Sequence, residues 1–277
     1  MTLLVTSAAG ANGDGYGKLL AFDDHGHFLG PFTDDHRIAD PRGLAVNVAD
    51  GLLFLNSGTE RILALDRNGQ IVRDTGPIEG LNPGGGNFGR DGRYYVGLRS
   101  VRTIIAFASR LDAAGEPILA SGVVPFPRGF AFGRDGRLFL ASGIGPNGEG
   151  NDTIIAFDTS RRILPSWSVR DPQLSPLDLA IAPNDNILVS SEYPFGALDA
   201  VTTIREYDAT DAHLVRVFSP SRSVKFRKPR GLRFDPDGKL HCVARDEVVA
   251  FDFGTCECLG AVVKMARLNG QALAFFG

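Results

Sequence analysis

The chain has 277 residues and a formal net charge of −3, which excludes the global basic excess expected of a protein that mainly coats nucleic acid. Its 34 glycines and 16 prolines favour many turns between short strands over long helices. The three cysteines, Cys242, Cys256 and Cys258, are too few for a disulfide framework and belong to no zinc ligand set, so we predict a reducing, cytoplasmic location.

The first residues predict a strand and not a targeting segment. The sequence MTLLVTSAAGANGDG has no positively charged start, and its apolar run is too short for a signal peptide. No stretch of the chain approaches the length of a membrane span. We therefore expect no membrane partner.

One six-residue pattern, close to TIIAFD, recurs along the whole chain. Its copies start roughly 42 to 50 residues apart, a spacing typical of four-stranded propeller blades. Each copy predicts the third strand of one blade. The copies are KLLAFD from Lys18, RILALD from Arg61, TIIAFA from Thr103, TIIAFD from Thr153, TIREYD from Thr203 and EVVAFD from Glu247.

A second pattern precedes most of these copies and predicts a hairpin of the first and second strands. It consists of Pro-x-Gly, an apolar strand, an Asp-Gly turn and another apolar strand, as in PRGFAFGRDGRLFLA from Pro127. Asp-Gly between alternating apolar runs predicts a two-residue hairpin turn, because such a turn demands positive φ angles. More variable segments such as HFLGPF and HLVRVFS follow the third strands, as expected of outer edge strands that face solvent.

The two ends of the chain are predicted to complete one blade together. LLVTSAAG at the start matches a second strand such as LFLASGIG from Leu138, while GQALAFF from Gly270 fits the missing first strand. We therefore predict a single all-β domain, a six-bladed β-propeller closed by pairing of the C-terminal strand with the N-terminal blade. The expected blades are residues 268–277 with 1–38, then 39–80, 81–124, 125–172, 173–226 and 227–267.

The layout resembles the NHL-repeat and gluconolactonase-like (SMP-30 type) six-bladed propellers, through the PRGLAV…DG hairpins followed by ILALD. The resemblance covers nearly the whole chain and implies the architecture, on which many activities occur. In SMP-30-like lactonases the openings of the first strands supply Asn and Asp ligands to a divalent metal. Here Arg42, Arg128 and Arg230 stand at those openings, and guanidinium groups repel a cation. We therefore expect no metal and no cofactor.

The first strands of a propeller line its central channel, so their opening residues share one face with the loops between second and third strands. Three arginines converging there suit an anion, because the guanidinium fork matches a carboxylate or phosphate. Alternatively, each arginine reaches a carbonyl of a neighbouring blade or a carboxylate. The predicted ligand-binding residues are Arg42, Arg128, Arg230, Gln271, Asn56, Arg99, Ser142 and Arg245.

Asp178 is the candidate catalytic residue that the repeat itself singles out. It replaces the glycine of the Pro-x-Gly unit, and departures from a repeat are where function tends to reside. Glu192 and Tyr193 follow the second strand of the same blade and are predicted to be its partners. Asp178 or Glu192 would then act as a general base.

The sequence favours a site that binds an anionic small molecule. The catalytic form of this hypothesis is a metal-independent lyase, isomerase or hydrolase. Two alternatives stay open. One is a non-enzymatic NHL-like module that binds a peptide or RNA, and the other is a metal-dependent lactonase-like hydrolase with a rearranged ligand set.

Overall fold

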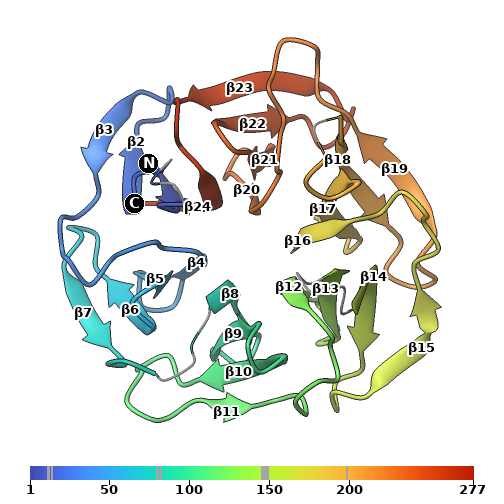
Figure 1. The fold of residues 1–277 in the computed structure, drawn as a ribbon, viewed down its shortest axis with the longest axis horizontal. Coiled ribbons are helices and arrows are strands. Elements are labelled where there is room, and N and C mark those ends of the chain that lie inside the picture. The colour runs from blue at the N-terminus through green and yellow to red at the C-terminus, as the bar shows by residue number, and fades with distance from the viewer. Residues whose placement is uncertain (11–12, 14, 79–80, 82, 145–149, 198) are drawn as a thin grey trace.

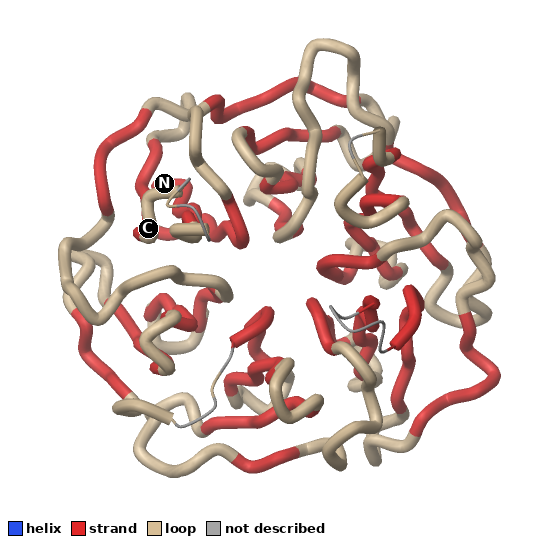
Figure 2. Tube along the Cα trace, in the orientation of Figure 1, coloured by secondary structure: helices blue, strands red, loops and turns tan. Residues whose placement is uncertain are grey.

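The computed structural model describes residues 1–10, 13, 15–78, 81, 83–144, 150–197 and 199–277. These residues form strands, turns and loops, and the strands belong to six four-stranded antiparallel sheets. The sheets stand around a central axis like the blades of a propeller (Figure 1), and loops alternate with strands throughout the trace (Figure 2). The six-bladed, all-β prediction is confirmed.

Each blade runs from an inner strand at the axis to an outer strand at the rim. Blade one consists of β24 (Gly270–Phe276), β1 (Thr2–Ser7), β2 (Lys18–Phe22) and β3 (Phe28–Pro31), and blade two of β4 (Leu44–Asn47), β5 (Leu52–Ser57), β6 (Arg61–Leu65) and β7 (Ile71–Asp74). Blade three consists of β8 (Pro83–Phe88), β9 (Tyr94–Leu98), β10 (Thr103–Phe107) and β11 (Glu116–Pro117), and blade four of β12 (Pro127–Phe132), β13 (Leu138–Ile144), β14 (Gly150–Phe157) and β15 (Ile163–Ser168). Blade five consists of β16 (Pro176–Ile181), β17 (Ile187–Tyr193), β18 (Val201–Tyr207) and β19 (Leu214–Phe218), and blade six of β20 (Leu232–Phe234), β21 (Leu240–Val243), β22 (Glu247–Phe251) and β23 (Cys258–Lys264).

The C-terminal strand closes the ring, as predicted. β24 pairs with β1 over nearly its whole length, from Thr2 opposite Phe276 to Ser7 opposite Gly270. The two chain ends consequently lie side by side in blade one (Figure 1). This pairing gives β1 a neighbour on its inner side and removes an open edge that would otherwise expose unpaired backbone groups.

The hairpin turns are longer than the sequence predicted. In blade three the Gly89 amide donates to the Arg93 carbonyl at 2.9 Å and the Gly92 amide to the Gly89 carbonyl at 3.1 Å. Residues 90–92 therefore form a three-residue loop, in which the glycine takes the left-handed conformation with φ of 74°. Asp91 is not left-handed; its carboxylate instead accepts the Arg93 amide at 3.1 Å. A type I turn followed by one left-handed residue explains this geometry.

The core lies between neighbouring blades. Alternate residues of each strand face the next sheet, so Leu53 and Leu55 of blade two pack with Leu4 and Ala274 of blade one. The same arrangement joins blades four and five around Trp167. Among the described residues no helix is long and apolar enough to cross a bilayer.

Small residues let the inner strands approach one another at the axis. The third position of the Pro-x-Gly pattern is occupied by Gly43, Gly85, Gly129 and Gly231, with Asp178 in blade five. A Cβ atom on Gly129 would lie 2.1 Å from Oδ1 of Asp178, and one on Gly231 would lie 2.9 Å from the Cα of Ala272. Only glycine fits at these two contacts. Among the described residues at this third position, Asp178 is therefore the one large polar side chain.

Candidate functional site

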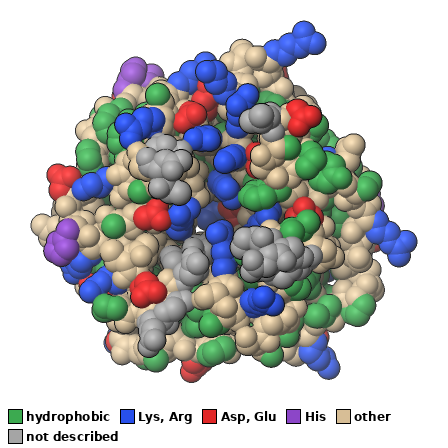
Figure 3. All heavy atoms as spheres, viewed as in Figure 1, with side chains coloured by type: hydrophobic (Ala, Val, Ile, Leu, Met, Phe, Trp, Pro, Cys, Tyr) green, Lys and Arg blue, Asp and Glu red, His purple; other side chains and the backbone are tan. Residues whose placement is uncertain are grey.

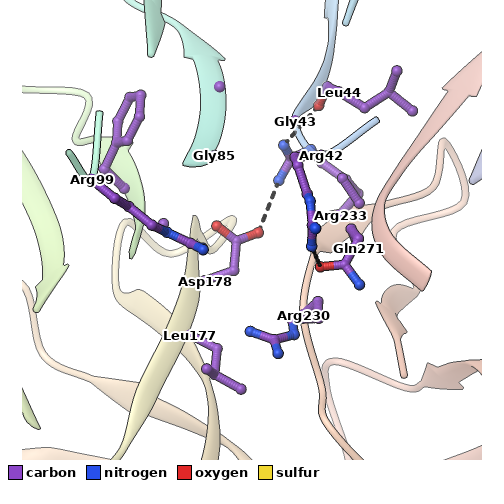
Figure 4. Close-up of a pocket in the computed structure, with 14 residues that line it drawn as sticks. Arg42, Gly43, Leu44, Gly85, Arg99, Leu177, Asp178, Arg230, Arg233 and Gln271 are labelled. Atoms are coloured by element: carbon purple, nitrogen blue, oxygen red, sulfur yellow. Dashed lines mark hydrogen bonds and ion pairs between the residues drawn. The ribbon is translucent and has the colours of Figure 1, made fainter. Parts of the chain in front are cut away.

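Gly43, Gly85, Gly129 and Asp178 line a narrow part of the central channel, which we call the throat. The cavity volume there is about 50 Å³, enough for a few water molecules and too small for a substrate. Figure 4 shows side chains from different blades pointing toward one another across this throat. The polar ones are Arg42, Arg99, Asp178, Arg230, Arg233 and Gln271.

Asp178 is held in the throat by blade six. Its Oδ2 accepts the Leu232 amide at 3.2 Å and lies 3.7 Å from the Arg233 guanidinium. Burial raises the pKa of the Asp178 carboxyl above its ordinary value, while the charge of Arg233 opposes that shift. The predicted partners Glu192 and Tyr193 are not among its contacts in the described part of the chain. The Asp178 carboxylate is thus tied to the neighbouring blade, while Glu192 and Tyr193, which were predicted to follow the second strand, form the end of β17.

Arg233 is a functional candidate that the sequence reasoning missed. Its guanidinium donates to the Leu232 carbonyl at 2.6 Å and, across the axis, to the Leu44 carbonyl of blade two at 3.1 Å. The signal was present in the repeat, since the same position holds alanine in blades two, four and five: Ala45, Ala131 and Ala180. A charged residue at a small apolar position of the inner strand indicates a side chain that enters the channel.

Above the throat the channel widens into a pocket of about 540 Å³, which we call the mouth. Figure 3 shows Lys and Arg side chains gathered around this central hollow. Arg99 and Arg230 line both the throat and the mouth, so the two spaces adjoin at these side chains. The mouth is lined by Arg99, Phe126, Arg128, Ile144, Asp152, Tyr193, Pro194, Phe195 and Arg230.

Of the arginines at the mouth, Arg128 is fixed by the protein. It is only 3% exposed, donates to the Pro176 carbonyl of the next blade at 2.8 Å, and lies over the Phe195 ring at 4.4 Å. Asp152 lies 3.9 Å from its guanidinium. For Arg128 the structural alternative, a side chain that reaches a neighbouring blade's carbonyl, is therefore realised.

Arg99 and Arg230 have few partners. The Nε of Arg99 is buried without a hydrogen-bond partner among the described residues. The Arg230 guanidinium forms no hydrogen bond or ion pair within the same part of the chain and lies 5.9 Å from the Phe195 ring centroid. Burial, with the nearby arginines, lowers the pKa of Arg99 to about 10. Both cations remain charged at neutral pH, and they meet at the point where the mouth joins the throat.

Arg42 and Gln271 line the throat and are hydrogen-bonded to each other. Arg42 donates to Oε1 of Gln271 at 3.2 Å and forms an ion pair with Asp40 at 2.9 Å. The amide of Gln271 donates in turn to the Asn269 carbonyl at 2.9 Å. Both side chains are thus held at the channel wall by partners within the protein.

Four other predicted residues line neither the mouth nor the throat. Asn56 is fully buried and accepts the Tyr94 hydroxyl at 2.9 Å, so it joins blades two and three. Ser142 is buried in β13 opposite Pro127. Glu192 and Arg245 line a different pocket, farther out between blades five and six. Of the predicted catalytic residues, Tyr193 alone reaches the mouth.

Among the lining residues of the mouth that the sequence analysis did not name, three carry a carboxylate or an aromatic ring. Asp152 supplies a carboxylate, and its Oδ1 has no hydrogen-bond partner among the described residues. Phe126 and Phe195 supply aromatic faces next to the arginines. Phe126 directly precedes the Pro-Arg-Gly unit of blade four. This aromatic residue next to a channel arginine in the sequence was the signal that could have identified it as a site residue.

Comparison with known proteins supports the fold. No protein-family model matches the sequence, and no curated protein matches it either. Solved structures do match. A gluconolactonase from Xanthomonas campestris is 17% identical with a TM-score of 0.63, over 81% of this chain and 76% of its own. A streptogramin B lyase is 14% identical with a TM-score of 0.58, over 77% of this chain and 66% of its own. A chain of a nidogen/laminin complex is 12% identical with a TM-score of 0.74, over 99% of this chain and 97% of its own.

The chain has the six-bladed fold of gluconolactonase-like propellers. At these identities the likeness establishes the fold alone, since one fold hosts many functions. The three neighbours themselves differ in their described roles. The chemistry of the site must therefore be argued from this chain's own residues.

The residues at the mouth do not fit a divalent cation of the kind that the lactonase resemblance implies. Of the described residues that line the mouth, one is a carboxylate, Asp152, and it lies among Arg99, Arg128 and Arg230. A calcium or magnesium site needs several oxygen ligands and is disfavoured by converging cations. In the described ranges, the groups of side chains close enough to hold a metal ion lie elsewhere, at Asp23, Asp24 and His25 and at Asp208, Asp211 and His213. The first group belongs to the turn between β2 and β3 and the second to the turn between β18 and β19.

Proposed function

We propose that the mouth binds a small molecule whose carboxylate or phosphate group lies against Arg99 and Arg230. The carrying observation is the Nε atom of Arg99, which is buried without a hydrogen-bond partner among the described residues and belongs to a side chain that lines both mouth and throat. A buried donor without a partner costs free energy, which an anionic ligand would recover through charge-assisted hydrogen bonds. Arg128 adds positive charge while its own hydrogen bonds remain with the protein.

The other mouth residues favour a ligand with a flat apolar body. Phe195 is 46% exposed and Tyr193 is 37% exposed, so both rings offer surface to a ligand. Phe126 lies on the arginine side of the same pocket. Aromatic faces stack on planar groups at little entropic cost. A pocket of about 540 Å³ has the size of small-molecule sites, which supports a small molecule over the alternative of a peptide or RNA lying on an open face.

Titration with phenyl phosphate, by calorimetry, tests the proposal. We expect Arg99→Gln/Arg230→Gln to weaken binding at least about tenfold, because two buried charge-assisted contacts are lost. A matched control, Arg90→Gln/Arg222→Gln, removes two exposed cations that line neither space and should leave the affinity within about twofold. Equal affinity in the wild type and the mouth variant would refute the site.

Asp152 gives a second candidate function, in which the same pocket catalyses metal-independent proton transfer. Its Oδ1 is buried and has no hydrogen-bond donor in the described residues, and Tyr193 lines the same space. A carboxylate beside a bound anion can accept a proton in elimination, isomerisation or hydrolysis. The enzymatic names of the gluconolactonase and lyase neighbours support this class. Asp178 lies too deep in the throat for that role.

The catalytic candidate predicts a split between turnover and binding. For any lactone or elimination substrate that the wild type converts, Asp152→Asn should lower kcat by about 10² to 10⁴, the range of a lost general base. KM should change little, since the arginines hold the anion. The Asp112→Asn variant is the comparison, because Asp112 is exposed and lines neither the mouth nor the throat. An unchanged kcat for Asp152→Asn would exclude this role.

A further inference from the structure

A second cationic pocket lies outside the mouth, between blades five and six. Its cavity volume is about 530 Å³, and it shares no lining residue with the mouth or the throat. We call it the rim pocket. It is lined by Glu192, Gly196, Ala197, Ala200, Thr202, Lys225, Arg227, Lys228, Arg245, Asp246 and Arg267.

Three of the lining cations belong to one short segment, residues 225–228, whose backbone is held at several points. Phe226 is 4% exposed and its ring lies 5.6 Å from that of Phe251. The Lys225 amide donates to Glu247 Oε2 at 2.7 Å, and the Arg227 carbonyl accepts the Arg245 amide at 2.8 Å. The hydroxyl of Thr202 in blade five donates to the Phe226 carbonyl. These contacts fix where the neighbouring cationic side chains begin.

The rim pocket concentrates positive charge in an acidic protein. Five of its lining residues are Lys or Arg and two are acidic, while the whole chain carries a net charge of −3. Lys225, Arg227 and Lys228 form no ion pair within the described part of the chain. Figure 3 shows Lys and Arg side chains continuing from the central hollow toward the upper edge of this face. Such a concentration attracts anions and is not needed for folding.

Glu192 gives the pocket a second, independent feature. It is 3% exposed, and its Oε2 is buried with no hydrogen-bond partner among the described residues. Its carboxylate also acts electrostatically on Arg128 and Arg230 of the mouth, so Glu192 stands in the wall between the two pockets. A buried acceptor without a donor carries a desolvation cost that a ligand hydroxyl would relieve.

We propose that the rim pocket is a separate binding site for a phosphorylated polyol, with the phosphates against Lys225 and Arg227 and a hydroxyl donating to Glu192. A ligand with two phosphate groups suits the excess of cationic over acidic side chains in the rim pocket, since Arg and Lys both bind phosphate oxygens. The hydroxyl matches the unpartnered carboxylate oxygen. This site is independent of the proposed function of the mouth.

Calorimetric titration with inorganic pyrophosphate and with fructose 1,6-bisphosphate tests the proposal. Both titrations use the Arg99→Gln/Arg230→Gln background, so that failure of the mouth does not affect the result. We expect both probes to bind this background, and Lys225→Gln/Arg227→Gln added to it to weaken both at least about tenfold. Adding Arg90→Gln/Arg222→Gln instead, the matched loss of two exposed cations, should change either affinity less than about twofold.

The contribution of Glu192 is read from the ratio of the two affinities. The background should prefer the sugar bisphosphate, and Glu192→Ala should abolish this preference while pyrophosphate binds as well or better, because a negative charge has been removed. No binding of either probe, or equal losses in the rim and control variants, would overturn the site. An unchanged ratio in Glu192→Ala would overturn the assignment of a hydroxyl-bearing ligand.

Discussion

A chain that ends at Asn269 is expected to lose its cooperative unfolding transition. The truncation removes β24, which supplies the inner strand of blade one and pairs with β1 from Thr2 to Ser7. Leu273 is fully buried, and Ala272, Ala274 and Phe276 are each under 10% exposed. Their loss uncovers apolar surface on both blade one and its neighbours and opens a sheet edge at the axis. Thermal unfolding followed by circular dichroism measures the outcome.

Two further variants keep this expectation open to refutation. Removal of Gly277 alone, which is exposed, should leave the transition unchanged. Leu273→Ala retains the strand and should cost about 2 to 5 kcal/mol, the usual range for a buried Leu truncation. If the chain ending at Asn269 unfolded cooperatively at the wild-type temperature, closure by β24 would not contribute to stability.

Asp178→Ala is expected to destabilise the protein by about 2 to 4 kcal/mol, because the Leu232 amide loses its acceptor and the Arg233 guanidinium loses its counter-charge in the throat. For a chain of this size that corresponds to a fall in Tm of about 5 to 15 °C. Arg134→Ala is the control, since its ion pair with Asp185 is solvent-exposed and should contribute less than about 1 kcal/mol.

A double-mutant cycle separates the pair from its surroundings. Asp178→Ala/Arg233→Ala should cost less than the sum of the single changes by about 1 to 3 kcal/mol, as expected for neighbouring charges. Additive losses would show that Asp178 and Arg233 are not coupled.

The same carboxyl predicts a pH dependence with a definite sign. Burial raises the folded-state pKa of Asp178 above its unfolded value, so the folded protein binds the proton more tightly and gains stability as the pH falls through the raised pKa. Asp178→Asn removes this gain. As the pH is lowered from neutral toward the ordinary pKa of Asp, the Tm of the wild type should therefore rise relative to that of Asp178→Asn. A Tm difference that stays constant over this range would contradict the raised pKa of Asp178.

Much of the architecture could be predicted because each blade repeats the same local signals. The TIIAFD-like copies correspond to third strands, as in β2 and β22, and the GQALAFF segment forms the closing strand. The turn type was predicted wrongly, since Asp91 caps the loop with its carboxylate while Gly92 alone takes the left-handed conformation. Short-range sequence signals predict the presence of a turn more reliably than the number of residues in its loop.

The candidate site was predicted in part. Arg99, Arg128, Arg230 and Tyr193 do line the mouth, while Asn56 and Ser142 are buried within the blades. Repeat position places a residue near the axis, but the direction of a side chain depends on bulges, such as the register shift between Pro127 and Phe130. Asp152 at the start of β14 and the loop residue Phe195 reach the mouth through contacts between blades that no local pattern encodes.

The sequence alone determined the number of blades, their closure and the cationic character of one face, because strand period, turn residues and repeat spacing are local properties. Tertiary structure alone decided which cations remain without a partner. Arg128 donates a hydrogen bond to the Pro176 carbonyl of the adjacent blade and Arg42 pairs with Asp40, whereas Arg99 and Arg230 meet few acceptors among the described residues. Hydrogen bonding and desolvation at the axis depend on backbone groups brought together from different blades, and these distances exist only in the closed ring.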